Sequence, residues 1–253
     1  MIFDTHAHYD DQQFDEDRYE LLDSLFSSDI CGIVNAAADL ESSEKSLELA
    51  NRYPKMYAAV GVHPENVGKT PAEECVDLLE GLIKKSKKVV AIGEIGLDYH
   101  FDRESKAAQK ILFESQIVLA KKHDLPVLVH DREAHGDTLD ILKQHKPKGI
   151  VHCFSGSLEM AREVIKLGMY LGIGGVVTFK NAKNLTEVVE NIPMENIVLE
   201  TDAPYLAPVP FRGKRCNSGY IRFVAEKISE IKKIEISQVY NKTLENARKI
   251  FNI

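Results

Sequence analysis

The chain has 253 residues, of which 44% are hydrophobic and 28% are charged, and its formal net charge at pH 7 is −7. This composition excludes a disordered or fibrous protein, and the length suits one large domain with a sizeable core. The acidic balance argues against a broad electrostatic grip on nucleic acid, although it leaves a local binding site open.

Short apolar runs rich in Val, Ile and Ala recur along the chain, and each is followed by a longer segment with apolar residues every three or four positions. This alternation predicts strands and helices in turn. The expected strands, in chain order, are Met1–Thr5, Cys31–Ala37, Met56–Val62, Val89–Glu94, Pro126–His130, Gly149–Phe154, Met169–Ile173 and Asn196–Asp202.

The segments between the expected strands are helical in pattern. In Glu104–His123, for example, apolar residues form a stripe between charged ones, and two further helices are expected near residues 218–231 and 236–251. Eight units of strand and helix can close into a (β/α)8 barrel, whereas a doubly wound open sheet more often has about five or six strands. We therefore predict an α/β protein with a single TIM-barrel domain over residues 1–253.

Side chains of the kinds that bind metal ions recur at the ends of six expected strands. In a TIM barrel, catalytic groups gather at the C-terminal ends of the strands and in the loops that follow them. Chance would have to place each residue independently, whereas one metal site accounts for all of them together. The candidates are His6, His8, His63, Glu94, His130, His152 and Asp202.

Each candidate also has a simpler interpretation when it is taken alone. His6 and His8 project to one side of an extended chain, but such a pair also occurs in exposed loops. A buried carboxylate at Glu94 needs a cation, which is either a metal ion or a Lys or Arg side chain. His130 and His152 each suit the position of a hydrogen-bonded core histidine. Asp202 suits a helix N-cap. Four further histidines are expected in ordinary helix or loop positions: His100, His123, His135 and His145.

Six short motifs together resemble the TatD family of metal-dependent hydrolases, which lies within the larger group of amidohydrolase-like barrels. The resemblance spans nearly the whole chain, and the combination of motifs is highly specific. In chain order the motifs are Phe3-Asp4-Thr5-His6-Ala7-His8, Gly61-Val62-His63-Pro64, Gly93-Glu94-Ile95-Gly96-Leu97-Asp98-Tyr99, Val129-His130-Asp131-Arg132, His152-Cys153-Phe154-Ser155-Gly156 and Glu200-Thr201-Asp202-Ala203-Pro204-Tyr205-Leu206.

The resemblance implies a site for two divalent cations that share one bridging carboxylate, Glu94. The other ligands would be His6, His8 and Asp202 for one ion, and His130 and His152 for the second. Mixed imidazole and carboxylate ligands accept Zn, Mn, Mg or Co with little discrimination. The family is associated with deoxyribonuclease activity that proceeds from 3′ ends. This association implies DNA, as single strands or 3′ ends, as the substrate.

In this hypothesis, a water activated between the two ions attacks the phosphodiester. Asp202 is expected to shuttle the proton, and Glu200 shares its strand face as a second acid. His63 and Asp98, at the rims of the third and fourth strands, are expected to position the phosphate or the attacking water. The expected catalytic groups are therefore these residues together with the bridging Glu94.

The segment after the last strand offers contacts for the substrate. Lys214 and Arg215 suit a phosphate, which arginine grips with two hydrogen bonds, although a solvated basic loop would have the same composition. The family pattern commonly has Arg, Asn and an acid after the lysine, whereas this chain has Arg215-Cys216-Asn217. Tyr205 is expected to stack on a base at the barrel mouth, although aromatic residues near strand ends more often serve packing.

Cellular location and assembly are constrained only loosely. The first residues lack the features of a signal peptide, and no long uncharged apolar segment follows, so we expect a cytoplasmic protein without membrane contact. A monomer is expected. The cysteines are far apart and form no C-x-x-C pair, which predicts reduced, structural thiols at Cys31, Cys75, Cys153 and Cys216.

Two other functions are compatible with the same ligands. A pair of metal ions also hydrolyses an ester, a lactone or an amide, because activation of water does not specify the electrophile. A non-catalytic metal-binding protein would keep the ligands but would need neither a proton shuttle nor an open coordination position.

Overall fold

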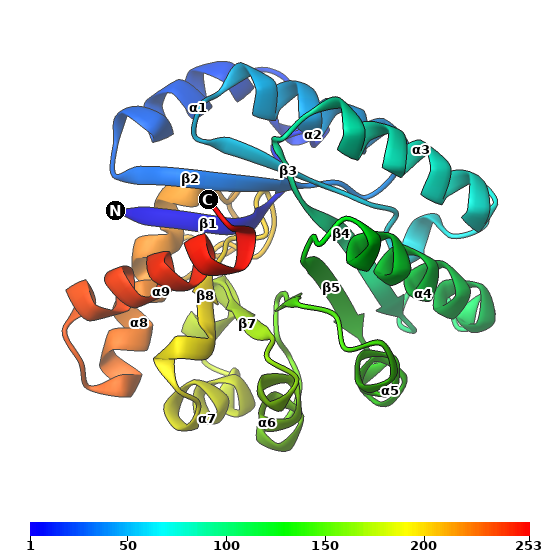
Figure 1. Cartoon of the computed structure of the whole chain (residues 1–253). Coiled ribbons are helices and arrows are strands. Elements are labelled where there is room, and N and C mark those ends of the chain that lie inside the picture. Colours follow the sequence, from blue (N-terminus) through cyan, green and yellow to red (C-terminus); the bar gives the residue numbers. More distant parts are fainter.

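The structure is a computed structural model that describes residues 1–253. Eight parallel strands form one sheet in the order β1 to β8, with the helices outside it (Figure 1). This is the predicted TIM barrel. The strands are β1 (Ile2–Ala7), β2 (Ile30–Ala36), β3 (Met56–Val60), β4 (Val89–Asp98), β5 (Val127–Arg132), β6 (Gly149–Val151), β7 (Tyr170–Ile173) and β8 (Ile197–Leu199).

Helices follow the strands around the outside of the barrel. They are α1 (Arg18–Ser27), α2 (Leu40–Arg52), α3 (Ala72–Lys85), α4 (Lys106–Lys122), α5 (His135–His145), α6 (Leu158–Lys166), α7 (Lys183–Asn191), α8 (Ile221–Lys232) and α9 (Ile236–Phe251). None of them combines the length and apolar character that crossing a bilayer requires. The four cysteines form no disulfide in the structure.

β4 and β5 extend beyond the ends predicted for them. They remain paired as far as Asp98 and Arg132, because each supplies the backbone partners that the other needs. Between Ile92 and Ile95 the register shifts, so that β4 advances one residue more than β5. Glu94 therefore lies at a bulge inside a strand rather than at the predicted strand end, and bulges of this kind redirect side chains.

The barrel closes between β8 and β1 through the segment that follows β8. The amide of Asp202 donates to His6 O at 2.9 Å, and the amide of His8 donates to Ala203 O at 2.7 Å. β8 itself ends at Leu199, so the strand predicted to reach Asp202 was too long, because the chain there turns to pair with β1. This closure brings Asp202 beside the two histidines of β1.

A buried carboxylate, Asp4, strengthens this closure. Its Oδ2 accepts hydrogen bonds from Thr201 Oγ1 at 2.6 Å and from Ser218 Oγ at 2.7 Å. Complete burial raises the pKa of Asp4 to about 6 although these hydrogen bonds oppose the shift. The carboxylate thus links the first strand to the segment after the last one.

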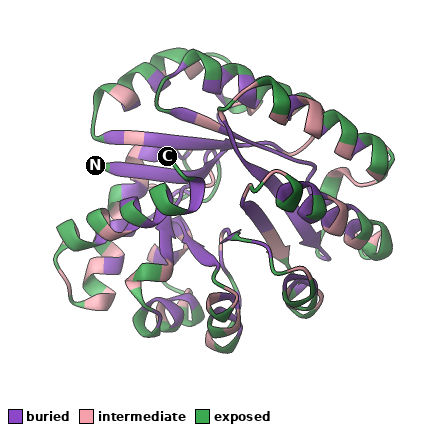
Figure 2. Ribbon diagram, viewed as in Figure 1, coloured by how far each residue is buried: buried purple, intermediate pink, exposed green.

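Buried residues occupy both faces of the strands (Figure 2). The larger apolar cluster includes residues of the strands and of the surrounding helices. The smaller cluster joins residues from all eight strands to the C-terminal helix α9. There Phe3 of β1 stacks on Phe251 of α9, with ring centroids 6.1 Å apart. Because Phe3 lies near the start of β1, α9 packs at the amino-terminal end of the barrel, opposite the polar strand ends.

We expect Phe251→Ala to lower the free energy of unfolding by about 3–5 kcal/mol, because it removes a buried ring and leaves a cavity. Chemical denaturation measures this change. Phe101→Ala is the matched control, since that ring is 60% exposed and its loss should change stability by less than about 0.5 kcal/mol. A loss below about 1 kcal/mol for Phe251→Ala would contradict a closing role for α9.

Candidate metal centre

A cavity of ≈720 Å³ opens at the carboxyl ends of the strands. Strands β4 and β5 contribute side chains to it directly, and the segments after the other six strands contribute the rest. The candidate residues that line the cavity are His8, His63, Glu94, Asp98, His130, His152, Asp202 and Tyr205. His6 is completely buried and lies behind them.

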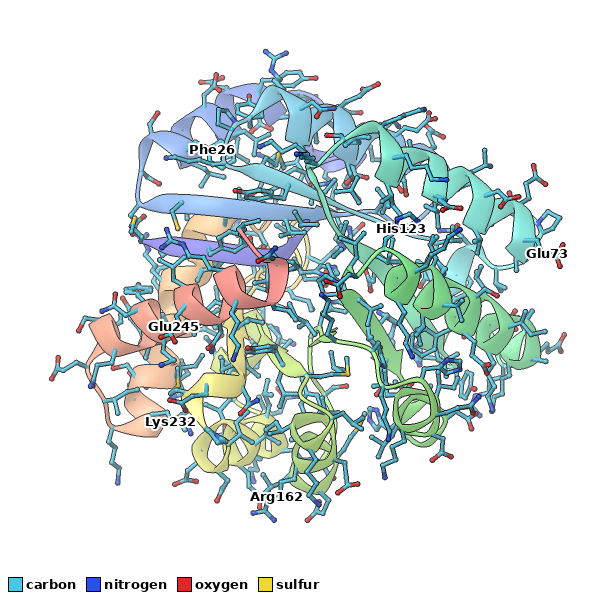
Figure 3. The ribbon with its side chains drawn as sticks, viewed as in Figure 1. Phe26, Glu73, His123, Arg162, Lys232 and Glu245 are labelled. Atoms are coloured by element: carbon cyan, nitrogen blue, oxygen red, sulfur yellow. The ribbon has the colours of Figure 1, made fainter.

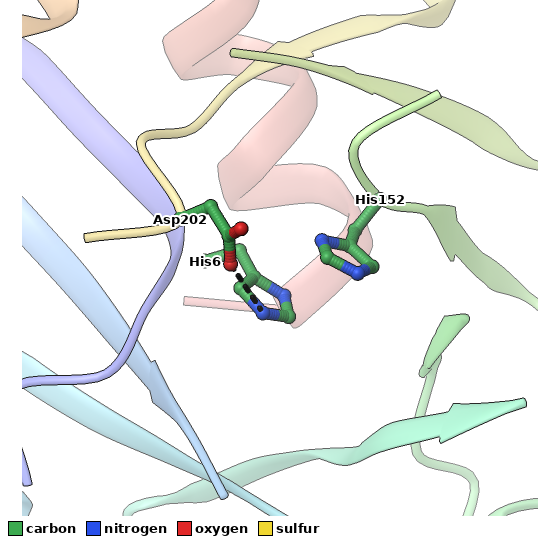
Figure 4. A group of neighbouring side chains, drawn as sticks. All are labelled: His6, His152 and Asp202. Carbon is green, nitrogen blue, oxygen red and sulfur yellow. Dashed lines mark ion pairs between the residues drawn. The ribbon is translucent and has the colours of Figure 1, made fainter. Parts of the chain in front are cut away.

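Glu94 is the central residue of the site, and one of its oxygens faces the end of β1. Glu94 Oε2 lies 3.2 Å from His6 Nε2 and 3.5 Å from His8 Nε2. Asp202 Oδ1 joins them, at 3.2 Å from His8 Nε2 and 3.7 Å from His6 Nε2. Figure 4 draws this ion pair between His6 and Asp202 as a dashed line. We call His6, His8, Asp202 and this oxygen of Glu94 the β1 group.

The other oxygen of Glu94 faces the ends of β5 and β6. Glu94 Oε1 lies 2.7 Å from His130 Nδ1 and 2.7 Å from His152 Nε2. His63 Nε2 is 3.4 Å from the same oxygen. We call His130, His152 and this oxygen of Glu94 the β5 group. A single carboxylate thus separates two sets of donor atoms.

The two groups are in direct contact. The rings of His6 and His152 stack with centroids 3.9 Å apart, and Figure 4 shows His152 across from His6 and Asp202. Three overlapping sets of side chains are arranged closely enough to hold a metal ion, and together they include all six ligands predicted from the sequence. These sets are His6, His8 and Glu94; His6, His152 and Asp202; and His63, Glu94 and His130.

The rings of His8 and His130 are held through their second nitrogens. His8 Nδ1 lies 2.7 Å from Ala36 O, and His130 Nε2 lies 3.1 Å from Asp98 Oδ2. Such contacts fix the tautomer and leave the opposite nitrogen free for a metal ion. The other oxygen of Asp98 accepts two backbone amides, and the residue is only 1% exposed. Asp98 therefore orients His130, which differs from the predicted contact with phosphate or water.

His63 differs from the other histidines of the site. Its Nδ1 accepts a hydrogen bond from the amide of Glu65 at 3.2 Å. In a neutral imidazole one nitrogen accepts and the other carries the proton, so Nε2 of His63 is the donor. His63 Nε2 lies 3.4 Å from Glu94 Oε1 without a hydrogen bond to it, so this N–H is available to a ligand in the cavity, and His63 is suited to donate a hydrogen bond rather than to bind a metal ion.

Charges within the site compensate one another in spite of burial. Burial favours the neutral form of Glu94, but positive charge on the surrounding histidines, His152 above all, holds its pKa well below the ordinary value. Burial likewise opposes protonation of His8 and His130, yet hydrogen bonds to their carboxylate partners raise the pKa of each to about 10. The carboxylates of this site are therefore ionised and require nearby positive charge.

Glu200 lies behind the β5 group and does not line the cavity. Its Oε1 accepts the amide of Cys153 at 2.5 Å and is 3.8 Å from His152 Nδ1, a buried atom that has no hydrogen-bond partner. Burial raises the pKa of Glu200 to about 8. A Cβ at Gly172 would lie 2.1 Å from Glu200 Oε2, so glycine is needed there to admit the carboxylate. The predicted second acid is thus separated from the cavity, because its backbone position directs it into the wall.

The cations predicted to bind phosphate do not line the cavity. Arg215 Nη1 donates to Asp17 Oδ1 at 2.8 Å and to Gln13 O at 2.6 Å, and the guanidinium lies over the Phe14 ring. Lys214 is exposed outside the cavity. The loop after β8 packs toward the β1 side, where Asp17 supplies a carboxylate for Arg215. This partner was not apparent from the sequence.

Tyr205, by contrast, lies at the cavity wall. Its ring is 47% exposed, and its hydroxyl donates to Asp11 Oδ2 at 2.7 Å, which connects the segments after β8 and β1. Arg132 also lines the cavity, although sequence reasoning did not select it. Its position two residues after His130 was the available signal, because alternate residues of a strand share a face.

The histidines expected to have no role in the site do not line the cavity. His123 is an example: Figure 3 shows it in the outer layer of helices, and its Nε2 lies 2.9 Å from Glu80 Oε1. Figure 3 also shows charged side chains such as Glu73, Arg162 and Lys232 around the periphery. The histidines of the site are distinguished from these by burial and mutual contact rather than by residue type.

Comparison with known proteins identifies the family. A family model described as TatD related DNase matches residues 3–252. The chain belongs to the TatD family of metal-dependent hydrolases. It is 42% identical over 256 residues to YabD of Bacillus subtilis, an uncharacterised metal-dependent hydrolase, and the match covers 100% of both chains. It is 33% identical over 254 residues to YjjV of Escherichia coli, covering 100% of this chain and 98% of YjjV.

Solved structures of TatD proteins have the same architecture. The crystal structure of YjjV superposes with a TM-score of 0.93 at 31% identity, covering 100% of this chain and 98% of that chain. A TatD family hydrolase from Entamoeba histolytica gives a TM-score of 0.87 at 26% identity, covering 98% and 97% of the two chains. The family resemblance inferred from the six motifs is thereby confirmed.

Proposed function

We propose that this TatD family hydrolase is a deoxyribonuclease that uses two divalent cations to remove nucleotides from the 3′ end of a DNA strand. The observation that carries the proposal is the division of ligands by Glu94, whose two oxygens face the β1 group and the β5 group separately. A carboxylate shared by two sets of ligands would hold two cations close together, which suits two-metal hydrolysis of phosphate esters. The description of the matching family model supports DNA as the substrate.

The donor atoms fit divalent cations. Four imidazole rings and two carboxylates converge, a mixed set of nitrogen and oxygen ligands that suits Zn, Mn or Co and also accepts Mg. His6 Nε2 and His8 Nε2 lie 3.1 Å apart, a distance at which two lone pairs repel unless a proton or a cation lies between them. No Lys or Arg side chain contacts these nitrogens to play that part.

Bound ions would supply a water of lowered pKa and would neutralise charge that develops on the phosphate oxygens. Asp202 is placed to take the proton from the attacking water, since Oδ1 faces His8 while Oδ2 has no protein partner and the side chain is 17% exposed. His63 lines the cavity and would donate its Nε2 proton to a phosphate oxygen. The exposed ring of Tyr205 would stack on the terminal base.

Glu200 acts on the reaction through His152 in this proposal. Glu200→Gln is expected to weaken metal binding at the β5 group by about 10- to 100-fold, because a bound cation favours the ionised form of Glu200, which an amide cannot supply, and outer carboxylates hold the rings of metal-binding histidines. Metal titration against a competing chelator measures the loss. Affinity of the β1 group and the thermal stability of the metal-free protein should stay near wild type, and exposed Glu187→Gln is the control. Equal weakening at both groups would contradict this role.

A different metallohydrolase activity is the second candidate, and the charge of the cavity favours it. Four acids outside the two ligand groups line the cavity together with Asp98, whereas Arg132 is the only Lys or Arg. A neutral ester, lactone or amide would enter such a cavity without repulsion. The four acids are Asp10, Asp11, Glu65 and Asp131.

The decisive experiment uses single-stranded DNA labelled at its 5′ end. The protein is stripped of metal and reloaded with Mn, Mg or Zn, with His130→Ala as the inactive control. We expect a ladder of fragments that shorten from the 3′ end. A strand whose 3′ end is blocked should resist cleavage. DNA that stays intact under every metal, in protein shown to bind two ions, would refute the nuclease proposal and would favour the neutral substrates.

A further inference from the structure

The guanidinium of Arg132 is free at the cavity wall. Arg132 ends β5, where its carbonyl accepts the amide of Tyr99 at 2.9 Å, so its backbone is held in the sheet. Its side chain is 53% exposed and donates no hydrogen bond within the protein. The nearest carboxylate oxygen, Asp98 Oδ2, is 4.0 Å from Nη1 and is already engaged by His130 Nε2 at 3.1 Å.

Other arginines near the strand ends are committed to protein partners. Arg103 donates to Glu133 Oε2 at 3.0 Å and to Tyr99 O at 3.2 Å. Arg18 donates to Asp15 and to three carbonyl oxygens, and Arg215 is held by Asp17 and Gln13 O. Arg132 alone among the Lys and Arg residues both lines the cavity and keeps its donors free.

The cavity is therefore polarised. Acids whose hydrogen-bond partners are all uncharged groups line it on the β1 side, namely Asp10 and Asp11, and Glu65 lines it on the β3 side, while the guanidinium stands on the β5 side. Asp131 precedes Arg132 in the chain and also lines the cavity. Its carboxylate is hydrogen-bonded to His135 Nδ1 at 2.7 Å and to Thr138 Oγ1 at 3.2 Å. An anionic substrate group is thus attracted toward β5 and repelled from the opposite wall.

We propose that Arg132 binds the phosphate at the scissile bond of the substrate and is the residue that selects phosphodiesters over neutral esters. This inference rests on the proposed function, because it names the phosphate contact of the same site. A guanidinium offers two parallel N–H groups to two phosphate oxygens, and a neutral ester has no oxygens of comparable charge to accept them. Because the cavity has one such cation, it binds one phosphate by this contact. A single phosphate contact is what we expect at the end of a DNA strand.

Binding of inorganic phosphate to the metal-loaded protein tests the proposal without any need for nuclease activity. Calorimetry should show that Arg132→Gln binds phosphate about 10- to 100-fold more weakly than wild type, the loss expected for a hydrogen bond to a charged group. Arg132→Lys should recover part of the affinity, because lysine keeps the positive charge but lacks the two parallel N–H groups of the guanidinium. Metal content and thermal stability must match wild type in both variants. Arg103→Gln is the control, since that side chain is held by Glu133 outside the cavity.

Kinetics then separate this proposal from the nuclease assignment. With bis(p-nitrophenyl) phosphate, Arg132→Gln should lower kcat/KM by about 10- to 100-fold. Phosphate affinity equal to wild type in Arg132→Gln would overturn the role of Arg132, whether or not the protein cleaves DNA. Weakened phosphate binding in a protein that cleaves no DNA would support the phosphate contact while refuting the deoxyribonuclease proposal.

Discussion

Glu94→Gln is expected to reduce metal-dependent hydrolysis by at least about 10³-fold, the equivalent of about 4 kcal/mol of lost transition-state stabilisation. Glutamine keeps the shape of the side chain but offers a single neutral carbonyl oxygen. It cannot serve the β1 group through one anionic oxygen and the β5 group through the other. Both ions depend on this carboxylate in our proposal.

Metal content provides the second readout for Glu94→Gln. Elemental analysis after dialysis should show a loss of bound metal relative to wild type, and circular dichroism should show an intact barrel. Glu44→Gln is the matched control, because Glu44 is an exposed residue of α2. Wild-type metal content together with wild-type activity in Glu94→Gln would rule out the bridging role of this residue.

Asp202→Asn is expected to lower kcat by about 10²- to 10⁴-fold, the usual contribution of a positioned general base. An amide cannot accept the proton of the attacking water, although its carbonyl oxygen keeps the position that Asp202 Oδ1 occupies beside His8. Because substrate is held by other groups in our proposal, KM should change much less than kcat. Steady-state kinetics on a phosphodiester give both constants.

The comparison for Asp202→Asn is Asp140→Asn, which changes an exposed carboxylate on α5. Metal content distinguishes the two functions proposed for Asp202. Loss of rate with full metal content supports proton transfer, whereas loss of rate together with metal supports ligation as well. A rate within about tenfold of wild type would argue that another group removes the proton.

Much of the metal centre was predictable because its chemistry requires particular residue types at particular places. His6 and His8 lie two residues apart at the end of a strand, and His130 and His152 each follow a run of apolar residues. Metal ions accept few ligand types, and parallel strands in a barrel deliver their carboxyl ends to one place. Residue identity and order along the chain were therefore enough to select the side chains that the structure brings together as possible metal ligands.

Supporting contacts were less predictable, because they depend on neighbours far away in the sequence. Arg215 appeared suited to phosphate from its composition, yet Asp17, distant in the chain, holds it away from the cavity. Glu200 shares a strand with Asp202 in sequence, but the space beside Gly172 admits its carboxylate into the wall. A pattern within one segment carries no information about which partner another segment presents.

The sequence by itself determined the alternating strands and helices, the family and the side chains that come together as possible metal ligands, since each depends on local periodicity or on residue chemistry. Only the tertiary structure decided which role each polar group has in the site. It placed Glu94 at a bulge between two ligand groups, turned Asp98 toward His130 and left Arg132 as the free cation. The physical reason is that burial, hydrogen bonding and charge compensation are properties of packed neighbours and arise only when the barrel closes.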